Sequence, residues 1–201
     1  MRFLTFLILS LSPIYAQNIK IAYGKVEKAP PMSICMDGAK HVFSCSNLRL
    51  KSKTINLAQF IGKYVKAEGK TITSLNKFCI TMTVLKVTVV SERLEIGGNW
   101  TPGGSIKYSI YSKPGNFSML FFSKAPRVIT ALGVLGTFYL NPKRFFDIGF
   151  GIIPGSGVLT GNLQIPNLTF LKNLKLIFQP FIADPRNITG FLANAWCVQI
   201  K

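Results

Sequence analysis

Few residues in this 201-residue sequence are of a type that could do chemistry. It contains one histidine, His41, and seven acidic residues. An enzyme needs a positioned acid, base, nucleophile or metal. A serine or cysteine triad could use His41 as its base, but there is no Gly-x-Ser-x-Gly elbow to aim a nucleophile. We therefore expect His41 to be a solvated loop histidine.

The acidic residues do not form a catalytic pair either. Two carboxylates can hydrolyse a glycosidic bond when they flank it, and Glu92 with Glu95 is the one close pair. Three residues apart in a strand, they point to opposite faces. Asp147 and Asp184 stand alone, and the glycine-containing stretch 149–155 lacks the strand-to-helix setting of a phosphate loop. The sequence predicts no catalytic residue, no cofactor and no enzymatic activity.

The four cysteines, Cys35, Cys45, Cys79 and Cys197, predict two disulfides, because an even number is typical of an exported chain. Three pairings can be drawn. We favour Cys45 with Cys79, since both are expected at strand ends of one domain; a bond from Cys197 to Cys35 would tie the leader to the second domain. The alternative is a metal site built from Cys35, His41 and Cys45. Its spacings do not match the short cysteine pairs of structural zinc sites, so we predict no metal.

The first sixteen residues, MRFLTFLILSLSPIYA, have a positive charge at Arg2 and then an apolar run that ends at Ala16. The run is shorter than the ~20 residues that a membrane-spanning helix needs. This pattern is typical of a cleaved signal peptide, which predicts a protein secreted to the periplasm or the cell surface. A second apolar run, Val128 to Leu140, contains two glycines and is expected to be core, so we predict no transmembrane segment in the mature chain.

The chain is strongly basic, with 24 lysines and arginines and a formal net charge of +17. Such a charge suits an anionic partner such as nucleic acid, an acidic polysaccharide or a component of the cell envelope. The charge is spread evenly, however. Residues 17–95 carry thirteen basic and five acidic residues, and residues 96–201 carry ten and two. There is no basic tail or stripe that would mark a binding surface.

Alternation of apolar and polar residues dominates the first half of the chain. Residues 17–42 are expected to be an extended leader, because Pro30 and Pro31 forbid a helix. Residues 43–96 contain three strand patterns, NLRLKS, YVKAEG and FCITMTVLKVTVV. In the third pattern Leu85, Val87 and Val89 are expected to share one face of the strand.

The segment 43–96 resembles a small OB-type barrel, and the motif that carries the resemblance is IGKYVKAEG, a Gly-Lys-x-Val-x-x-x-Gly arrangement. The resemblance implies a barrel that binds oligonucleotides or oligosaccharides through one face. On the outward faces of its strands we expect a candidate polyanion-binding set. It consists of Arg49, Lys51, Tyr64, Lys66 and Lys86. The alternative is that these are ordinary solvated strand positions, where lysine blunts exposed edges.

Residues 97–104, GGNWTPGG, are predicted to be a linker, since glycine and proline break regular structure. Residues 105–201 contain strand-length pieces about ten residues apart, which is typical of an antiparallel β-sandwich. On the motifs GTFYLNP, SGVLTGNLQIPN and IFQPFIADP this segment resembles the C-terminal sandwich modules of secreted planctomycete-type bacterial proteins. The resemblance implies an extracellular module without an assigned chemistry.

These observations predict an all-β protein, a small OB-like barrel followed by an antiparallel β-sandwich. The expected function is that of an exported, non-catalytic binding, adhesive or envelope-associated structural protein. The alternatives are a secreted OB-type binder of an anionic polymer and a hydrolase of unrecognised type.

Overall fold

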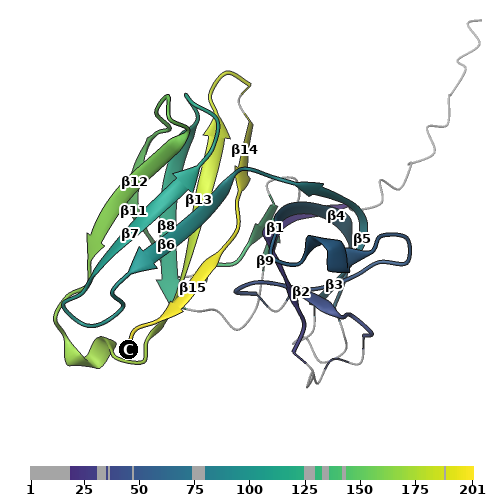
Figure 1. Ribbon diagram of the computed structural model, residues 1–201, viewed down its shortest axis with the longest axis horizontal. Helices are drawn as coiled ribbons and strands as arrows, with labels where there is room; N and C mark the ends of the chain where they lie inside the picture. The colour runs from purple at the N-terminus through teal and green to yellow at the C-terminus, as the bar shows by residue number, and fades with distance from the viewer. Residues whose placement is uncertain are drawn as a thin grey trace, which may run out of the picture.

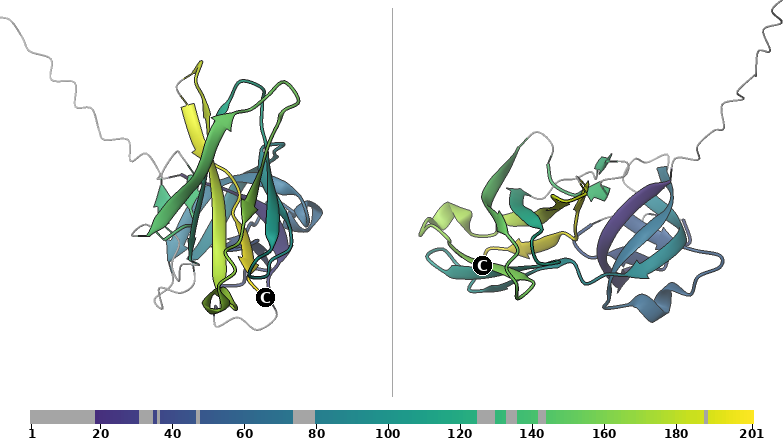
Figure 2. Two further views of the ribbon diagram at one scale, coloured as in Figure 1. Left: turned by 90° about the vertical axis from the view of Figure 1, so that its left-hand side faces the viewer. Right: turned by 90° about the horizontal axis from the view of Figure 1, so that it is seen from above.

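The computed structural model describes residues 19–30, 35, 37–46, 48–73, 80–124, 130–132, 136–141, 144–187 and 189–201, without the side chains of 72, 73 and 130–132. The predicted signal peptide, 1–16, and Cys79 lie outside the described residues. The described chain is built from β-strands with two short 3-10 helices, so the all-β prediction is confirmed. A barrel and a sandwich lie side by side (Figures 1 and 2).

The strands are β1 (Lys20–Lys28), β2 (His41–Phe43), β3 (Leu48–Lys51), β4 (Tyr64–Thr73), β5 (Ile80–Val89), β6 (Arg93–Gly98), β7 (Ser105–Tyr111), β8 (Phe117–Lys124), β9 (Thr130–Leu132), β10 (Gly136–Phe138), β11 (Phe145–Ile152), β12 (Val158–Gln164), β13 (Lys175–Asp184), β14 (Thr189–Leu192) and β15 (Trp196–Gln199). The 3-10 helices are η1 (Leu57–Phe60) and η3 (Thr169–Leu171).

The barrel is closed in the order β1-β2-β3-β5-β4, with β4 returning to pair with β1. Neighbouring strands are antiparallel except β3 and β5, which are parallel. A five-stranded barrel with a Greek-key order is the OB architecture, so the expected OB-like barrel is present. Its interior is filled by Phe43, Leu48, Leu50, Val65, Met82 and their neighbours, which are almost fully buried.

The barrel begins earlier in the chain than the sequence pattern indicates, because β1 lies inside the expected leader. Its inward positions are the small residues Ala22 and Gly24 together with Val26. A Cβ atom on Gly24 would lie 2.6 Å from the ring of Phe43, so the ring takes the space that a side chain would fill. Small inward residues give a weak apolar alternation, which is why the pattern does not reveal this strand.

A register shift also changes one expected strand face. Between Glu68 and Gly69 of β4 the pairing with β5 skips Leu85, which forms a β-bulge. An extra residue reverses the alternation of side chains. Leu85 is therefore 52% exposed, and the expectation that it shares a face with the core-packed Val87 is wrong.

The second module is a sandwich of two antiparallel sheets, as predicted. One sheet has the order β12-β7-β6, and the other has β11-β8-β13, with β14 and β15 both pairing with the far side of β13. With β14 and β15 counted as one interrupted strand, the sandwich strands in chain order are β6, β7, β8, β11, β12, β13 and β14–β15. The fourth of these, β11, therefore lies in the same sheet as the third, the sixth and the seventh. This differs from an immunoglobulin constant domain, where the fourth strand joins the first, second and fifth. Leu94, Ile110, Leu120, Phe178 and Ile182 form the centre of the core.

The predicted linker at residues 97–104 is part of the sandwich. Gly97 and Gly98 belong to β6 and pair with β7, and the residues after them form the turn of that hairpin. Gly98 has a φ of +119°, a conformation that favours glycine. The barrel ends at Val89 and the sandwich begins at Arg93, so only a few residues connect them.

An arm formed by β9 and β10 lies between the modules. The Thr137 hydroxyl donates to the carbonyl of Ile21 at 3.1 Å, and the Tyr139 hydroxyl donates to the carbonyl of Tyr23 at 3.1 Å. The Tyr23 ring stacks on Phe191 with 4.8 Å between centroids. Burial raises the pKa of Tyr23 to about 12, with Glu92 and Glu68 adding to the shift, and burial also raises the pKa of Tyr139. The arm therefore fixes the first barrel strand against the sandwich.

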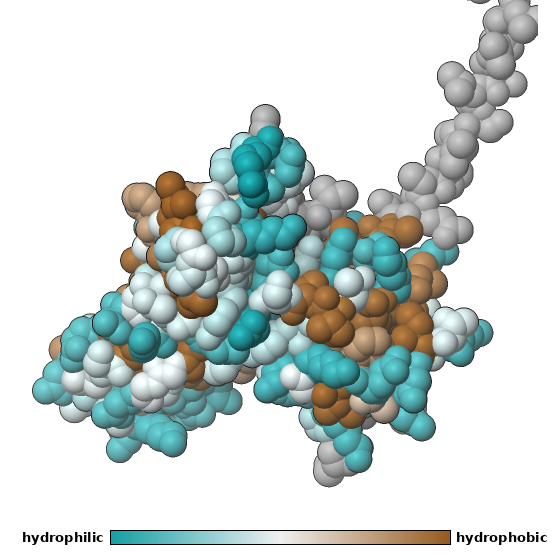
Figure 3. All heavy atoms as spheres, turned by 45° about the horizontal axis from the view of Figure 1, so that its top comes forward, coloured by the Kyte–Doolittle hydropathy of each residue, from teal (hydrophilic) through white to brown (hydrophobic). Residues whose placement is uncertain are grey.

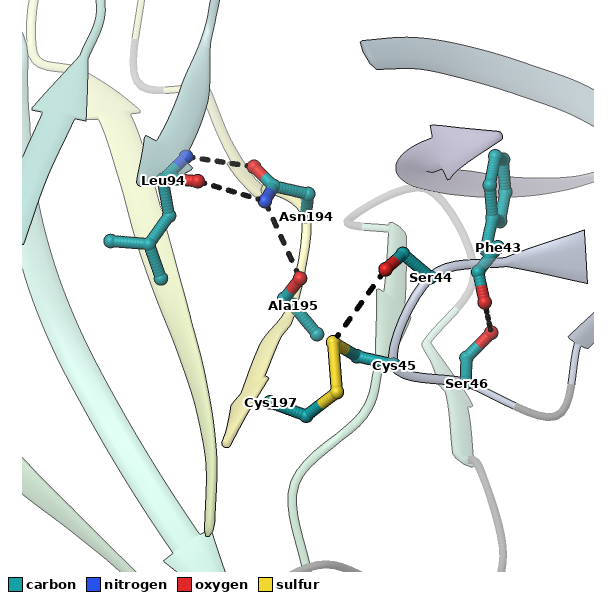
Figure 4. Close-up of a disulfide and its surroundings, with 8 residues drawn as sticks. All are labelled: Phe43, Ser44, Cys45, Ser46, Leu94, Asn194, Ala195 and Cys197. Carbon is teal, nitrogen blue, oxygen red and sulfur yellow. Dashed lines mark hydrogen bonds between the residues drawn. A yellow bond between two sulfur atoms is a disulfide. The ribbon is translucent and has the colours of Figure 1, made fainter. Parts of the chain in front are cut away.

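Two buried amides hold this arrangement from the sandwich side. Gln179 of β13, fully buried, donates to the carbonyls of Thr137 at 2.8 Å and Ala193 at 3.0 Å, and accepts from the backbone N–H of Tyr139 at 2.9 Å. Asn194, between β14 and β15, exchanges hydrogen bonds with both backbone groups of Leu94 (Figure 4). Because each amide satisfies backbone groups that the strands leave unpaired, the interruption in the last strand costs little.

A disulfide crosses the junction, the contact region between the barrel and the sandwich. Cys45, in the turn between β2 and β3, is bonded to Cys197 of β15, with the Cα atoms 5.3 Å apart (Figure 4). The favoured pairing of Cys45 with Cys79 is therefore wrong, and so is the bond from Cys35 to Cys197. Cys35 is itself disulfide-bonded, so it is not a free metal ligand. The reason for the error is spatial: Cys45 and Cys197 are 152 positions apart and meet only because the modules dock.

Candidate functional site

The structure separates the five predicted binding residues into two places. Arg49 and Lys51 lie on β3, beside Thr81 and Thr83 of β5. Tyr64 and Lys66 lie at the start of β4, towards the sandwich, and Lys86 lies on the paired part of β5. They do not form one continuous basic surface.

Arg49 does not project to solvent as the sequence pattern indicates. It is 8% exposed, and its Nε donates to both carboxylate oxygens of Asp37 at 3.1 Å. A second donor, Nη2, bonds the carbonyl of Ala39 at 2.6 Å. Asp37 comes from the connection between β1 and β2, which covers this part of the barrel. The guanidinium is thus already paired with an anion of the same chain.

Asp37 is held as a carboxylate by its surroundings. Burial opposes its ionisation, but hydrogen bonds from the Thr81 hydroxyl, the Ala39 N–H and Arg49 outweigh burial and hold the pKa of Asp37 below its usual value. Lys51 also donates to the Asp37 carbonyl at 3.4 Å. The cluster therefore fastens the connecting segment to β3 and β5.

The other two lysines of the predicted set, Lys66 and Lys86, both lie beside the acidic residue Glu68. Lys66 pairs with Glu68 two residues along β4, with 3.1 Å between Nζ and Oε1. Lys86 is exposed and lies opposite Glu68 in the register of β4 and β5. On the face drawn in Figure 3, hydrophilic surface is likewise interrupted by apolar surface. This mixture of charges lowers the local attraction for a polyanion.

Tyr64 is the predicted residue that lines a groove. The groove lies between the barrel and the sandwich, has a volume of about 700 Å³, and receives side chains from both modules. The lining side chains with polar or aromatic groups are Lys25, Tyr64, Glu95, Lys107, Ser109 and Trp196. A smaller hollow of about 240 Å³ continues along Lys25, Glu27 and Tyr64 to the disulfide. Two partly exposed aromatic rings thus stand among hydrogen-bonding groups of both charges.

Arg93 contacts Tyr64 and Glu95, two of the side chains that line this groove. Its guanidinium carbon lies 3.8 Å from the ring centroid of Tyr111 and 5.9 Å from that of Tyr64. Its Nε donates to Glu95 at 2.8 Å, and this hydrogen bond lowers the pKa of Glu95 against the opposing effect of burial. Glu95 is therefore an acceptor of hydrogen bonds at neutral pH. Glu92 lies in the turn before β6 and accepts from Ser91 at 3.1 Å.

His41 is at the start of β2 and half-buried, not in a loop. Burial and the charge of Lys40 lower its pKa. Among the residues that the structure describes, no three histidine, cysteine or acidic side chains come together as a metal site would require. Within the same residues, no helix has the length and apolar character needed to cross a bilayer.

Sequence reasoning missed most of the groove. Trp196, Lys107 and Lys25 were not singled out, because each lies in a different strand and only docking brings them to Tyr64. The available signal was Trp196 in the strand pattern of the last residues, close to a cysteine. None of the protein-family models, curated proteins or solved structures compared with the chain matches it. The likeness to planctomycete-type modules stays a prediction.

Proposed function

We propose that the protein is an exported, non-catalytic binding protein of the cell envelope that holds an oligosaccharide strand in the groove between its modules. The observation that carries this proposal is the placement of Tyr64 and Trp196 in one groove with Lys25, Glu95, Lys107 and Ser109. Sugar rings present apolar faces and hydroxyl edges, so they suit aromatic rings surrounded by donors and acceptors. The groove has the volume of a ligand site, since such sites span about 300–1,000 Å³.

A rigid frame supports binding without catalysis. The Cys45–Cys197 bond and the hydrogen bond from Tyr139 to Tyr23 join the two walls of the groove, and the Asn194 amide fixes the last strand beside β6 within the sandwich wall. A preformed groove loses less conformational freedom when a ligand binds. Glu95 has its carboxylate engaged by Arg93, a partner that keeps it ionised, whereas a general acid needs a proton to give.

The predicted signal peptide and the cysteine chemistry both support the proposed location. A disulfide bond persists in oxidising compartments and is rare in the cytosol. The bond between Cys45 and Cys197 thus supports a place outside the cytoplasm. The sugar polymers of the envelope are the ligands met there.

The alternative, binding of an anionic polymer through the barrel, is less well supported. Arg49 is paired with Asp37, and Lys66 with Glu68. The remaining support for polyanion binding is the formal net charge of +17, to which the exposed Lys86 contributes. The two functions differ in salt dependence, because contacts with a polyanion release counterions and weaken steeply as salt rises.

The test is retention of the mature protein on an array of neutral and acidic oligosaccharides, at low and at high salt. Wild type should bind a neutral oligosaccharide with little salt dependence. Tyr64→Ala should weaken binding about fivefold or more, if stacking on a sugar is comparable to the roughly 1–3 kcal/mol measured for bases. The control is Phe150→Ala, which removes a ring that is 72% exposed and does not line the groove. Binding that survives in Tyr64→Ala, or that vanishes at high salt, would contradict the proposal.

A further inference from the structure

The sandwich contains an apolar cavity that is separate from the groove between the barrel and the sandwich, which is called the junction groove below. It has a volume of about 410 Å³ and lies between the two sheets. The lining consists of Trp100, Ile106, Phe122, Ile148, Leu163, Ile165, Pro166, Leu171, Leu174, Leu176, Phe178 and Ile200, with Asp147 and Gln164 as its polar members. A cavity lined almost wholly by apolar groups does not hold water well and accepts apolar ligands.

Lysines gather beside this cavity. An adjoining hollow of about 390 Å³ shares Leu174 with it and is lined by Lys124, Lys172, Lys175, Asn173 and Phe170. Phe122 of the cavity and Lys124 of the hollow are two residues apart on β8, so their side chains follow one another on the same face. Among the described residues, no acidic side chain pairs with any of the three lysines. They are therefore available to an anion from outside the chain.

The positions of the charged side chains indicate how an anionic amphiphile would be oriented in the cavity. Asp147 of β11 lies on the cavity wall and would repel an anion there, whereas the lysines lie beyond Leu174. Phe170 of η3, which lines the lysine hollow, is 76% exposed, and Leu168, the residue before η3, is 44% exposed. Both η3 and the C-terminus, which contributes Ile200, lie at one end of the sandwich (Figure 1). An apolar tail would lie between the sheets, with its head group at this end.

We propose that this cavity and its lysines form a second binding site, for a single-chain amphiphile with an anionic head, of which a fatty acid is the example. The volume lies near the lower end of the usual range for ligand sites, about 300–1,000 Å³, which suits one acyl chain and not two. The apolar lining recognises the tail, and Lys124, Lys172 and Lys175 recognise the carboxylate. The site does not depend on oligosaccharide binding, because it shares no lining residue with the junction groove.

The test uses 11-bromoundecanoate, below the concentration at which it forms micelles, and the mature full-length protein. Bromine quenches indole fluorescence at short range, and Trp100 lines the cavity. In a Trp196→Phe variant, where Trp100 is the remaining tryptophan, the fatty acid should quench fluorescence in a saturable manner. Quenching that appears only with micelles, or that does not saturate, would overturn the proposal.

Three comparisons sharpen the result. In the series from decanoate to tetradecanoate, each methylene should tighten binding about fourfold until the cavity is full. Replacing Lys124, Lys172 and Lys175 with alanine should weaken carboxylate binding about tenfold, from three partly screened charges, and leave the alcohol of the same length unaffected. Replacing Lys53, Lys70 and Lys113 with alanine is the control, since these exposed lysines carry equal charge away from both sites, and the affinity for the fatty acid should not change.

The variant Leu174→Phe fills the space where the cavity meets the lysine hollow. It should abolish binding of both acid and alcohol while the protein unfolds at an unchanged or higher temperature. Equal loss of affinity in the two lysine variants would overturn the proposed site, because general charge would then explain the binding. Preferred binding of phospholipid vesicles over the free acid would also overturn it.

Discussion

Cys45, between two barrel strands, is disulfide-bonded to Cys197 in the last strand of the sandwich, 152 positions away. The bond joins the modules next to the hollow that extends the groove between them. It thus adds a covalent restraint to contacts that also come from the β9–β10 arm. The geometry of the groove depends on these contacts, and they can be tested one at a time.

We expect Cys45→Ser with Cys197→Ser to lower the free energy of unfolding by about 2–4 kcal/mol, because the bond restricts the unfolded chain. The double variant should remain folded, since the hydroxyls of Thr137 and Tyr139 still bond to the first barrel strand. The measurement is denaturant unfolding, combined with a peptide map of the wild type under non-reducing conditions. A peptide that joins Cys45 to Cys79 in that map would refute the pairing.

The ion pair of Arg49 and Asp37 is predicted to be structural. Each of Arg49→Ala and Asp37→Ala should destabilise the barrel by about 3 kcal/mol, because each leaves a largely buried charge without its partner. The double variant should lose much less than the sum of both, so the interaction shows as coupling in a double-mutant cycle. Strictly additive losses would mean that the two side chains act independently. Lys86→Ala is the surface control and should change stability by less than about 0.5 kcal/mol.

Acid should destabilise the protein through identified groups. The pKa of Asp37 is lowered in the folded state, so its contribution is present above the unfolded value of about 3.9 and is lost as pH falls through the lower folded value. His41, whose pKa is also lowered, stabilises above its unfolded value of about 6.5 and loses that contribution below it. Urea midpoints should therefore decline slightly below about pH 6.5 and steeply below about pH 4. In Asp37→Asn the steep part should shrink, and an unchanged slope would exclude Asp37 as its source.

Gln179 is predicted to be the central polar contact of the junction. Gln179→Met keeps the size of the side chain but leaves the Tyr139 N–H and the carbonyls of Thr137 and Ala193 without their partner. Each buried unpaired group costs about 1–3 kcal/mol, so the loss should exceed about 3 kcal/mol. Gln164→Met, at an exposed amide, is the matched control. Similar stability of both variants would mean that Gln179 adds nothing that a thioether cannot replace.

The sequence predicted the architecture better than the site. Alternation at Leu48 and Leu50, and at Val65 and Ala67, revealed barrel strands because these side chains face a core that is local in sequence. The pattern missed β1, whose inward residues are small, and it placed Arg49 outside, because nothing local indicates that Asp37 will cover it. The same limit applies to Cys45 with Cys197 and to Tyr64 with Trp196. Both pairs are made by docking of the modules, which strand periodicity does not describe.

The central claim is that the junction groove binds an oligosaccharide and leaves it intact. The direct measurement is an NMR titration of the mature protein with the oligosaccharide that the array retains best, followed by analysis of the recovered sugar. We predict that the shifts will cluster at Tyr64, Lys107 and the Trp196 indole N–H, and that the sugar will keep its length. Shifts confined to the barrel surface around Lys51 and Lys86, shortened sugar, or the absence of any retained oligosaccharide would contradict the claim.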